Sequence, residues 1–236
     1  MKLYLMQLAA FTDPDAPVPG YLIQTDDGVN ILVDTGLPKM LAGAYRTVPG
    51  SEVRMDEEDL AVSQLGRIGV APEDVHYLVC THFDGDHAGN NADFPAAEHV
   101  VQRAHLEAAR GGLERLQHTR REWDAPGLRY RVVDGDTELV PGVELIESSG
   151  HVPGHQAVLV RLPETGPVLL AIDAIPVAAL LDPDTRRITE HDMDEAGVRA
   201  STRKLVDLAA REDAMIVHGH DATQWRSLLK LPDHYS

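Results

Sequence analysis

The chain has 236 residues, of which 43% are hydrophobic and 25% charged, a composition typical of a globular protein with a sizeable buried core. Its 21 basic and 38 acidic residues give a net charge of −17, which argues against nucleic acids and anionic membrane surfaces as partners. The only cysteine, Cys80, excludes an intrachain disulfide and suits a reducing compartment, so we expect a cytoplasmic protein. The apolar segment 3–11 is followed by no small-residue cleavage site, which favours a first strand over a signal peptide.

The first third of the chain reads as strands followed by a helix. Asp26-Asp27-Gly28, between two apolar runs, is a strong hairpin signal. In chain order we expect a strand at 1–10, a Pro-rich loop at 12–20, strands at 21–24 and 29–33, a helix at 51–65 and a buried strand at 77–80.

The rest of the chain repeats this mixture of strands and helices. In chain order we expect a strand at 98–102, a helical segment at 103–122 that is interrupted at Gly111-Gly112, a β-meander with strands at 130–133, 137–140 and 143–147, strands at 156–162, 168–172 and 214–217, and helices at 194–211 and 222–229. Because the strands form two clusters, each with helices, we expect an α/β fold in which two sheets pack face to face with helices outside. We expect residues 1–236 to form a single domain.

Four potential metal ligands lie within six residues of the loop after the strand at 77–80. They are His82, Asp84, Asp86 and His87. Charged groups at the end of a buried strand must be paired, solvated or bound to a cation, so packing alone does not explain this cluster.

Further candidate ligands, His151, Asp173 and His220, also follow predicted strands. Mixed histidine and carboxylate ligands suit zinc, manganese or iron, and the lack of thiolate ligands argues against a structural zinc finger. Seven donors are too many for one tetrahedral ion, so we expect two divalent ions bridged by a carboxylate such as Asp173. Such ions lower the pKa of a bound water to roughly 7 and make it a nucleophile at neutral pH.

Other polar residues near these motifs are expected to have supporting roles. His218 competes with His220, and the Gly-His-Asp context favours His220. Asp34 is expected to brace the ligand loop by hydrogen bonding, and His155 to be structural. The remaining residues are expected to lie at the surface or in the packing, namely His99, His105, His118, His191, His234, Phe83, Trp123 and Trp225.

Taken together, these motifs resemble those of the metallo-β-lactamase-fold hydrolases, which have an αββα sandwich with a metal site at one edge. The resemblance covers nearly the whole chain and rests on 31–36, the H-x-x-x-D-H core of the ligand loop, Gly150-His151, Asp173 and 219–221. Within this superfamily the chain is most similar to the N-acyl-homoserine lactonase branch. The supporting stretches are 87–90, 150–156 and 220–225.

The resemblance implies roles for the candidate ligands. His82, Asp84 and His151 would hold the first ion, Asp86, His87 and His220 the second, and Asp173 would bridge both. Asp86 would also pass a proton to the leaving alkoxide. Two positions depart from the family pattern: Asp84 stands where the family usually has a third histidine, and Pro176 where these lactonases often have a tyrosine that helps to hold the substrate carbonyl.

The expected function is therefore that of a metal-dependent hydrolase, in which a metal-bound hydroxide opens a lactone ring, as in quorum quenching. We expect two divalent ions, zinc first, with Asp84 favouring manganese or iron, and a small lactone or ester as the partner; a homodimer is compatible with the sequence. Alternatives are a hydrolase of another ester, a thioester or a phosphoester, an iron-dependent redox enzyme, and a metal-poor binding protein.

Overall fold

Two sheets pack face to face in the computed structural model, which describes residues 1–12, 15–43, 46–48 and 51–236. The first sheet has the order β4-β5-β1-β2-β3-β6-β7-β8, with β1 (Lys2–Thr12), β2 (Asp15–Gln24), β3 (Asn30–Val33), β4 (Arg46–Val48), β5 (Ser51–Arg54), β6 (Tyr77–Val79), β7 (Glu98–Gln102) and β8 (Arg129–Val133). The second has the order β13-β12-β11-β10-β9, with β9 (Thr137–Val140), β10 (Val143–Glu147), β11 (Gln156–Leu162), β12 (Gly166–Ile172) and β13 (Met215–His218).

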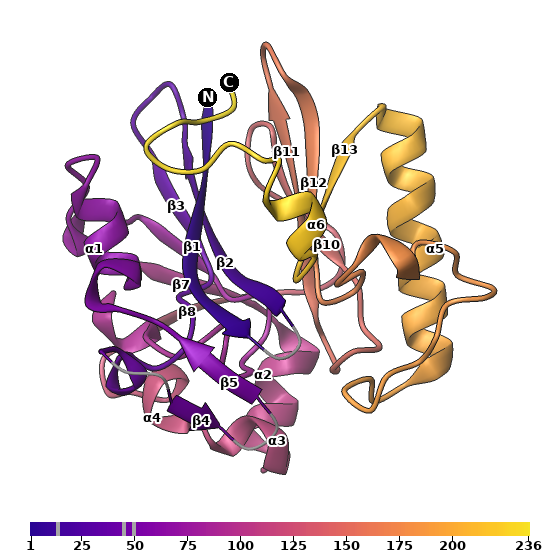
Figure 1. Cartoon of the computed structure of the whole chain (residues 1–236), viewed down its shortest axis with the longest axis horizontal. Coiled ribbons are helices and arrows are strands. Elements are labelled where there is room, and N and C mark those ends of the chain that lie inside the picture. The colour runs from indigo at the N-terminus through magenta and orange to yellow at the C-terminus, as the bar shows by residue number, and fades with distance from the viewer. Residues whose placement is uncertain (13–14, 44–45, 49–50) are drawn as a thin grey trace.

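Helices cover the outer faces of both sheets (Figure 1). The α-helices are α1 (Ala61–Gly66), α2 (Arg103–Arg110), α3 (Glu114–Gln117), α4 (Arg120–Trp123), α5 (Glu195–Glu212) and α6 (Ala222–Trp225). Short 3-10 helices are η1 (Lys39–Leu41), η2 (Glu57–Asp59), η3 (Pro72–Asp74), η4 (Asn91–Asp93) and η5 (Ala178–Leu180). The predicted αββα sandwich is confirmed.

Each layer boundary has its own apolar core, because alternate strand residues point to opposite faces. On β1, Leu3 and Leu5 enter the core between the two sheets, whereas Tyr4 and Met6 enter the core under α1 and α2. On the other side, Leu205 of α5 packs against the outer face of the second sheet. Both sheets are thus buried on both faces, which explains their continuous apolar runs.

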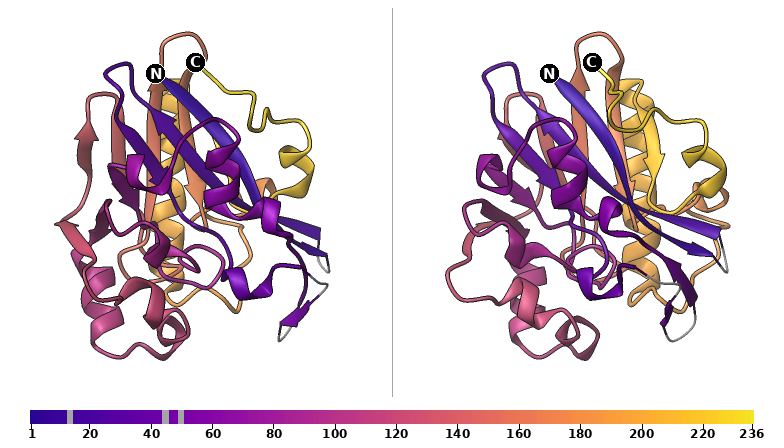
Figure 2. Two further views of the ribbon diagram at one scale, coloured as in Figure 1. Left: turned by 90° about the vertical axis from the view of Figure 1, so that its left-hand side faces the viewer. Right: turned by 60° about the vertical axis from the view of Figure 1, so that its left-hand side comes forward.

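The two ends of the chain are paired with each other. Leu3 forms an antiparallel bridge with Tyr235, and both termini lie beside one another in the two views of Figure 2. Within the described residues, the helices are too short or too polar to cross a membrane.

The predicted Pro-rich loop at 12–20 is wrong, because most of this segment belongs to β2. Pro17 pairs with Ala10 and Pro19 with Gln7 of β1. On its other side β2 pairs with β3 only over residues 21–24, so the prolines lie where no second strand requires their missing N–H groups. Residues 13 and 14 of the predicted loop lie outside the described part of the chain.

Two other predictions need correction. Of the helix predicted at 51–65, the first residues form β5, where Val53 pairs with Phe11, and the α-helix begins only at Ala61. The predicted β-meander is wrong as well: β8 pairs in parallel with β7 in the first sheet, whereas β9 and β10 pair in the second. The turn at residues 134–136 therefore carries the chain from one sheet to the other, a step that looks like a tight hairpin in the sequence.

Candidate active site

The candidate ligands meet at one edge of the sandwich because parallel strands in both sheets end there. In the first sheet β3 and β6 are parallel, so Asp34 and the loop that follows β6 lie at the same edge. In the second sheet β12 and β13 are parallel, which places Asp173 beside the residues that follow His218. Loops that follow parallel strands on a rigid scaffold are common positions for functional side chains.

The backbone is held in an uncommon conformation directly before Asp173. Ile172 has a φ of 51°, an outlier for a β-branched residue, and a cost of about 1–3 kcal/mol is typical of such strain. Gly219 approaches this turn so closely that a Cβ there would lie 2.7 Å from the Ile172 carbonyl oxygen and 3.0 Å from Asp173 Oδ1. The strained turn and the glycine together allow the Asp173 carboxylate to face the histidines of the site.

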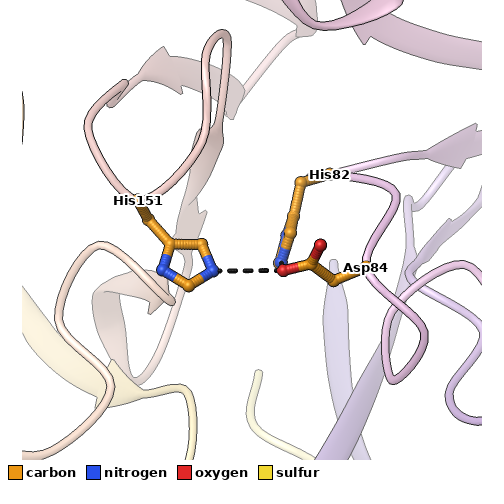
Figure 3. A group of neighbouring side chains, drawn as sticks. All are labelled: His82, Asp84 and His151. Atoms are coloured by element: carbon orange, nitrogen blue, oxygen red, sulfur yellow. Dashed lines mark hydrogen bonds and ion pairs between the residues drawn. The ribbon is translucent and has the colours of Figure 1, made fainter. Parts of the chain in front are cut away.

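The first group of donors consists of His82, Asp84 and His151. His82 and Asp84 come from the loop after β6, and His151 reaches them from the second sheet (Figure 3). Asp84 Oδ2 lies 3.3 Å from His82 Nε2 and 3.3 Å from His151 Nε2. We call this group the first position.

The second group of donors consists of Asp86, His87 and His220. Asp86 Oδ2 lies 3.7 Å from His87 Nε2 and 3.7 Å from His220 Nε2. We call this group the second position. Tetrahedral ligands about 2.0–2.2 Å from a zinc ion lie about 3.3–3.6 Å apart, so these spacings fit one ion with little adjustment.

Asp173 faces both positions with different oxygens. Oδ1 lies 3.4 Å from His87 Nε2 and 3.0 Å from His220 Nε2, at the second position. Oδ2 lies 3.3 Å from His151 Nε2 and 3.9 Å from His82 Nε2, at the first. This is the geometry required of a bridging carboxylate.

Several of these buried atoms have no hydrogen-bond partner among the described residues. They are His82 Nε2, His87 Nε2 and Asp173 Oδ1. Buried polar atoms are nearly always satisfied, so unpaired donors that face one another indicate a site suited to a cation. The second position, where two of the three meet, fits a divalent metal ion.

The outer nitrogens of the histidines are held by hydrogen bonds that fix each ring. His87 Nδ1 lies 2.9 Å from Asp34 Oδ2, and the same carboxylate accepts from the backbone N–H of Thr81 at 3.0 Å. His220 Nδ1 donates to the Pro17 carbonyl oxygen at 2.8 Å. Such contacts orient metal-binding imidazoles and select the tautomer that leaves Nε2 for the ion.

The field of the carboxylates dominates the electrostatics of the site. Burial disfavours the imidazolium of His87, but Asp173 and Asp86 outweigh burial and raise the pKa of His87 well above its ordinary value. In the same way, burial opposes the ionised form of Asp173, yet His220 and His87 hold its pKa well below the usual range. The site therefore attracts positive charge, which a divalent cation would supply.

One residue of the site, Arg115 on α3, is not among the sequence candidates. Its Nε donates to both oxygens of Asp84, at 2.8 and 2.9 Å, and its Nη2 also donates to Asp84. Nη2 also lies 2.8 Å from His151 Nε2. The first position therefore already contains a cation, and it differs in this respect from the second.

A cavity of about 740 Å³ opens over the two positions. Its wall includes Asp86, Arg115, Pro176, His191 and His220. Pro176 thus lies in the wall, where it offers no hydroxyl to a substrate. The volume is that of an ordinary small-molecule site.

Most of the other sequence candidates fall where their predicted supporting roles require. His218 Nδ1 donates to the Ile175 carbonyl oxygen at 3.2 Å, away from the donor groups. His155 is fully buried and contacts Ser148 Oγ at 2.8 Å. His118 and His191, predicted to lie at the surface or in packing, line the cavity.

Some residues of the site were not predicted from the sequence. Arg115 is one, and Asp192, whose Oδ1 lies 3.4 Å from His151 Nδ1, is another. Burial would lower the pKa of His151, but Asp192 and Asp84 raise it to about 9. Neither residue lies in a recognisable motif, and only the tertiary structure brings them to the site.

An αββα sandwich with histidine and carboxylate donors at one edge defines a metallohydrolase-type fold. Residues 14–220 match the model of the metallo-beta-lactamase superfamily, and the chain belongs to that superfamily. It is 36% identical over 231 residues to an N-acyl homoserine lactonase from a Bacillus species, covering 93% of this chain and 87% of that protein. It is 35% identical over 249 residues to the N-acyl homoserine lactonase AttM from Azorhizobium caulinodans, covering 94% of this chain and 89% of that protein.

Solved structures agree with this assignment. An N-acyl homoserine lactone hydrolase with the product N-hexanoyl-L-homoserine bound at its catalytic metal center superposes with a TM-score of 0.85 at 31% identity, covering 99% of this chain and 98% of that one. A mutant of AiiA from B. thuringiensis, with N-decanoyl-L-homoserine bound at its active site, also gives a TM-score of 0.85 at 31% identity, with the same coverage.

Proposed function

We propose that this protein is a metal-dependent hydrolase that opens the ring of N-acyl-homoserine lactones or of closely related lactones. The observation that carries the proposal is the convergence of Asp86, His87, His220 and Asp173 beneath a cavity. The lactonase relatives and the product-bound structures support the choice of substrate.

We propose zinc as the ion, held at the second position by Asp86, His87, His220 and Asp173. A divalent ion there supplies a Lewis acid and brings the pKa of water to roughly 7. The protein contributes the orientation of the donors: Asp34 fixes His87, and the Pro17 carbonyl oxygen fixes His220.

Asp86 is suited to hand a proton to the departing oxygen. Its side chain is 20% exposed and lines the cavity, so it can reach a substrate as well as the ion. Ring opening turns the ester oxygen into an alkoxide, which needs a proton. Asp86 would take this proton from the attacking water and pass it to the alkoxide, and positioned acid–base catalysis of this kind typically contributes about 10²–10⁴-fold.

The structure weakens one of the alternative functions. An iron-dependent redox enzyme was suggested by Asp84, as a hard ligand of an iron ion. Because Asp84 is bonded through both oxygens to Arg115, it is not free to act in that way. Cytoplasmic location, a homodimer and a single domain over residues 1–236 stay predictions.

The test is a substrate panel on the zinc-loaded protein. Short-chain and long-chain N-acyl-homoserine lactones, an aryl ester, a thioester and a phosphodiester are compared by kcat/KM, and the ring-opened acid is identified by mass spectrometry. We expect the lactones to give the highest kcat/KM. If the phosphodiester or thioester is preferred by tenfold or more, the proposal is wrong.

Two histidine variants distinguish a proposed metal ligand from a structural histidine nearby. His220→Ala should abolish lactone opening and lower zinc content. His218→Gln should retain both, because His218 points to the Ile175 carbonyl oxygen and glutamine keeps a donor for it.

A further inference from the structure

The first position holds a positively charged group that belongs to the protein itself. The guanidinium of Arg115 bonds both oxygens of Asp84, a bidentate pairing that is among the strongest between side chains. Its Nη1 also donates to the His191 carbonyl oxygen. Arg115 is therefore held from two sides, by the loop after β6 and by the segment before α5.

The contact with His151 is the one that conflicts with a metal ion. The Nε2 atom of an imidazole can donate a hydrogen bond, accept one or bind a metal ion, but only one of these at a time. His151 Nε2 lies 2.8 Å from Arg115 Nη2 and 3.3 Å from Asp84 Oδ2, so it is already engaged by the two partners of the ion pair. An ion at the first position would need this nitrogen free.

The second position shows no such competition among the described residues. His87 Nε2 and Asp173 Oδ1 have no hydrogen-bond partner there, and both point to the same space. At the first position only His82 Nε2 lacks a partner, and its neighbour at 3.3 Å is Asp84 Oδ2, an atom that is bonded to Arg115.

We infer that the guanidinium of Arg115 takes the place of the first cation in this protein, so that each chain binds one divalent ion, at the second position. The donor set of the first position does not fit a metal ion as long as Arg115 is paired with Asp84. The inference rests on the proposed metal-binding role of this site, and it replaces the two ions expected from the sequence with one.

The inference also accounts for both departures from the family pattern. A carboxylate at position 84 forms the bidentate pair with arginine that a histidine cannot form. Pro176 supplies no donor to the substrate carbonyl, whereas Arg115, in the same cavity wall, carries a fixed positive charge and N–H groups.

The experiment counts metal ions. Purified protein is stripped with a chelator, titrated with zinc while calorimetry records the heat, and then dialysed and analysed for zinc per chain. For the wild type we expect a single-site isotherm and one ion per chain. For Arg115→Met we expect two ions, because Asp84 and His151 are then free to bind the second one.

Two further variants make the count decisive. Asp84→His removes the partner of the guanidinium and restores a third imidazole, so it should also bind two ions, even if Arg115→Met fails to fold. Arg120→Met is the matched control: it removes an arginine of the neighbouring helix α4 that is paired with an aspartate, Asp124, and should keep one ion.

Two results would overturn the inference. The first is two zinc ions per wild-type chain at saturation. The second is a count of one ion in both Arg115→Met and Asp84→His. Because the count does not depend on turnover, a protein that binds one ion but opens no lactone would contradict only the proposed function.

Discussion

Asp34 supports the site by holding two neighbouring residues of the ligand loop in place. It has a positive φ of 59° at the end of β3, and its carboxylate is fully committed to neighbours. Oδ2 accepts from Thr81 Oγ1 at 2.7 Å and contacts His87 Nδ1 at 2.9 Å. These contacts are those of the bracing role expected for Asp34 from the sequence.

A test of this bracing is Asp34→Asn, which keeps the shape but replaces an acceptor with an amide. The imidazole of His87 then loses the carboxylate that fixes its tautomer, so we expect a roughly 10–100-fold weaker zinc affinity. The measurement is competition with a coloured chelator. Asp27→Asn, in the exposed turn between β2 and β3, serves as the control and should not change the affinity.

The proposed proton transfer from Asp86 predicts a dependence on the leaving group. With Asp86→Asn, kcat for a lactone should fall about 10²–10⁴-fold, because the alkoxide must leave without its proton. A thiolactone, whose thiolate is a far better leaving group, should lose much less. Zinc content is measured on the same preparation, since Asp86 is also a proposed ligand, and equal losses for both substrates at full zinc content would contradict the role.

Arg115 marks the limit of what sequence motifs can predict at this scale. The ligand loop is recognisable because its donors lie within six residues of one another. Arg115 is separated from Asp84 by a strand and two helices, and nothing in its own segment differs from an ordinary charged helix. Only the packing of α3 against the site makes it part of the chemistry.

At the scale of elements, α5 connects the second sheet to the site. Asp194 caps its N-terminus by accepting from the Ala196 N–H at 3.0 Å. The first turn also packs against the His151 loop: a Cβ at Gly150 would lie 2.1 Å from Val198 N. The start of this helix therefore packs directly against the residue before His151.

The cap can be tested with Asp194→Ala. Loss of an N-cap typically costs about 1 kcal/mol, and we expect that decrease in the free energy of unfolding, measured with urea. Asp207→Ala is the control, because Asp207 is exposed in the middle of the same helix and caps nothing there. A decrease in the control as large as that in Asp194→Ala would argue against the cap.

Helices and strands with a clear hydrophobic pattern or clear flanking turn residues could be predicted from the sequence. Strands that are defined by the strands they pair with could not. The segment 156–162 is apolar from Ala157 to Val160 and forms β11 as predicted. In contrast, β2 includes prolines that local rules assign to a loop, and only the lack of a β3 partner beside them explains the strand. The sheet to which β8 belongs is likewise set by contacts with β7, which are distant in sequence.

For the molecule as a whole, the free energy of unfolding at acid pH depends on histidines that are buried in the neutral form. His99 on β7 is fully buried away from the metal site. Its Nε2 contacts the Asn91 carbonyl oxygen at 3.3 Å, and its Nδ1 has no partner within the described structure. Burial is the main cause that lowers its pKa below the ordinary value.

The sign of the effect follows from proton linkage. Below pH about 6.5, His99 is protonated in the unfolded chain but still neutral in the folded one. The unfolded state then binds more protons, so stability falls as the pH drops, by at most about 1.4 kcal/mol per pH unit for this one histidine. Above pH about 6.5 both states are neutral at this residue, and it contributes no pH dependence.

In His99→Gln the free energy of unfolding should therefore fall less steeply as the pH drops below neutrality. Its pH dependence above neutrality should not change. Urea unfolding of the zinc-loaded protein is compared between wild type and variant at several pH values on both sides of about 6.5. His234→Gln is the control, since this residue is only partly buried near the C-terminus and should leave the acid slope as it is. If the wild type and His99→Gln lose stability in parallel as the pH falls, another group is responsible for the acid sensitivity of the fold.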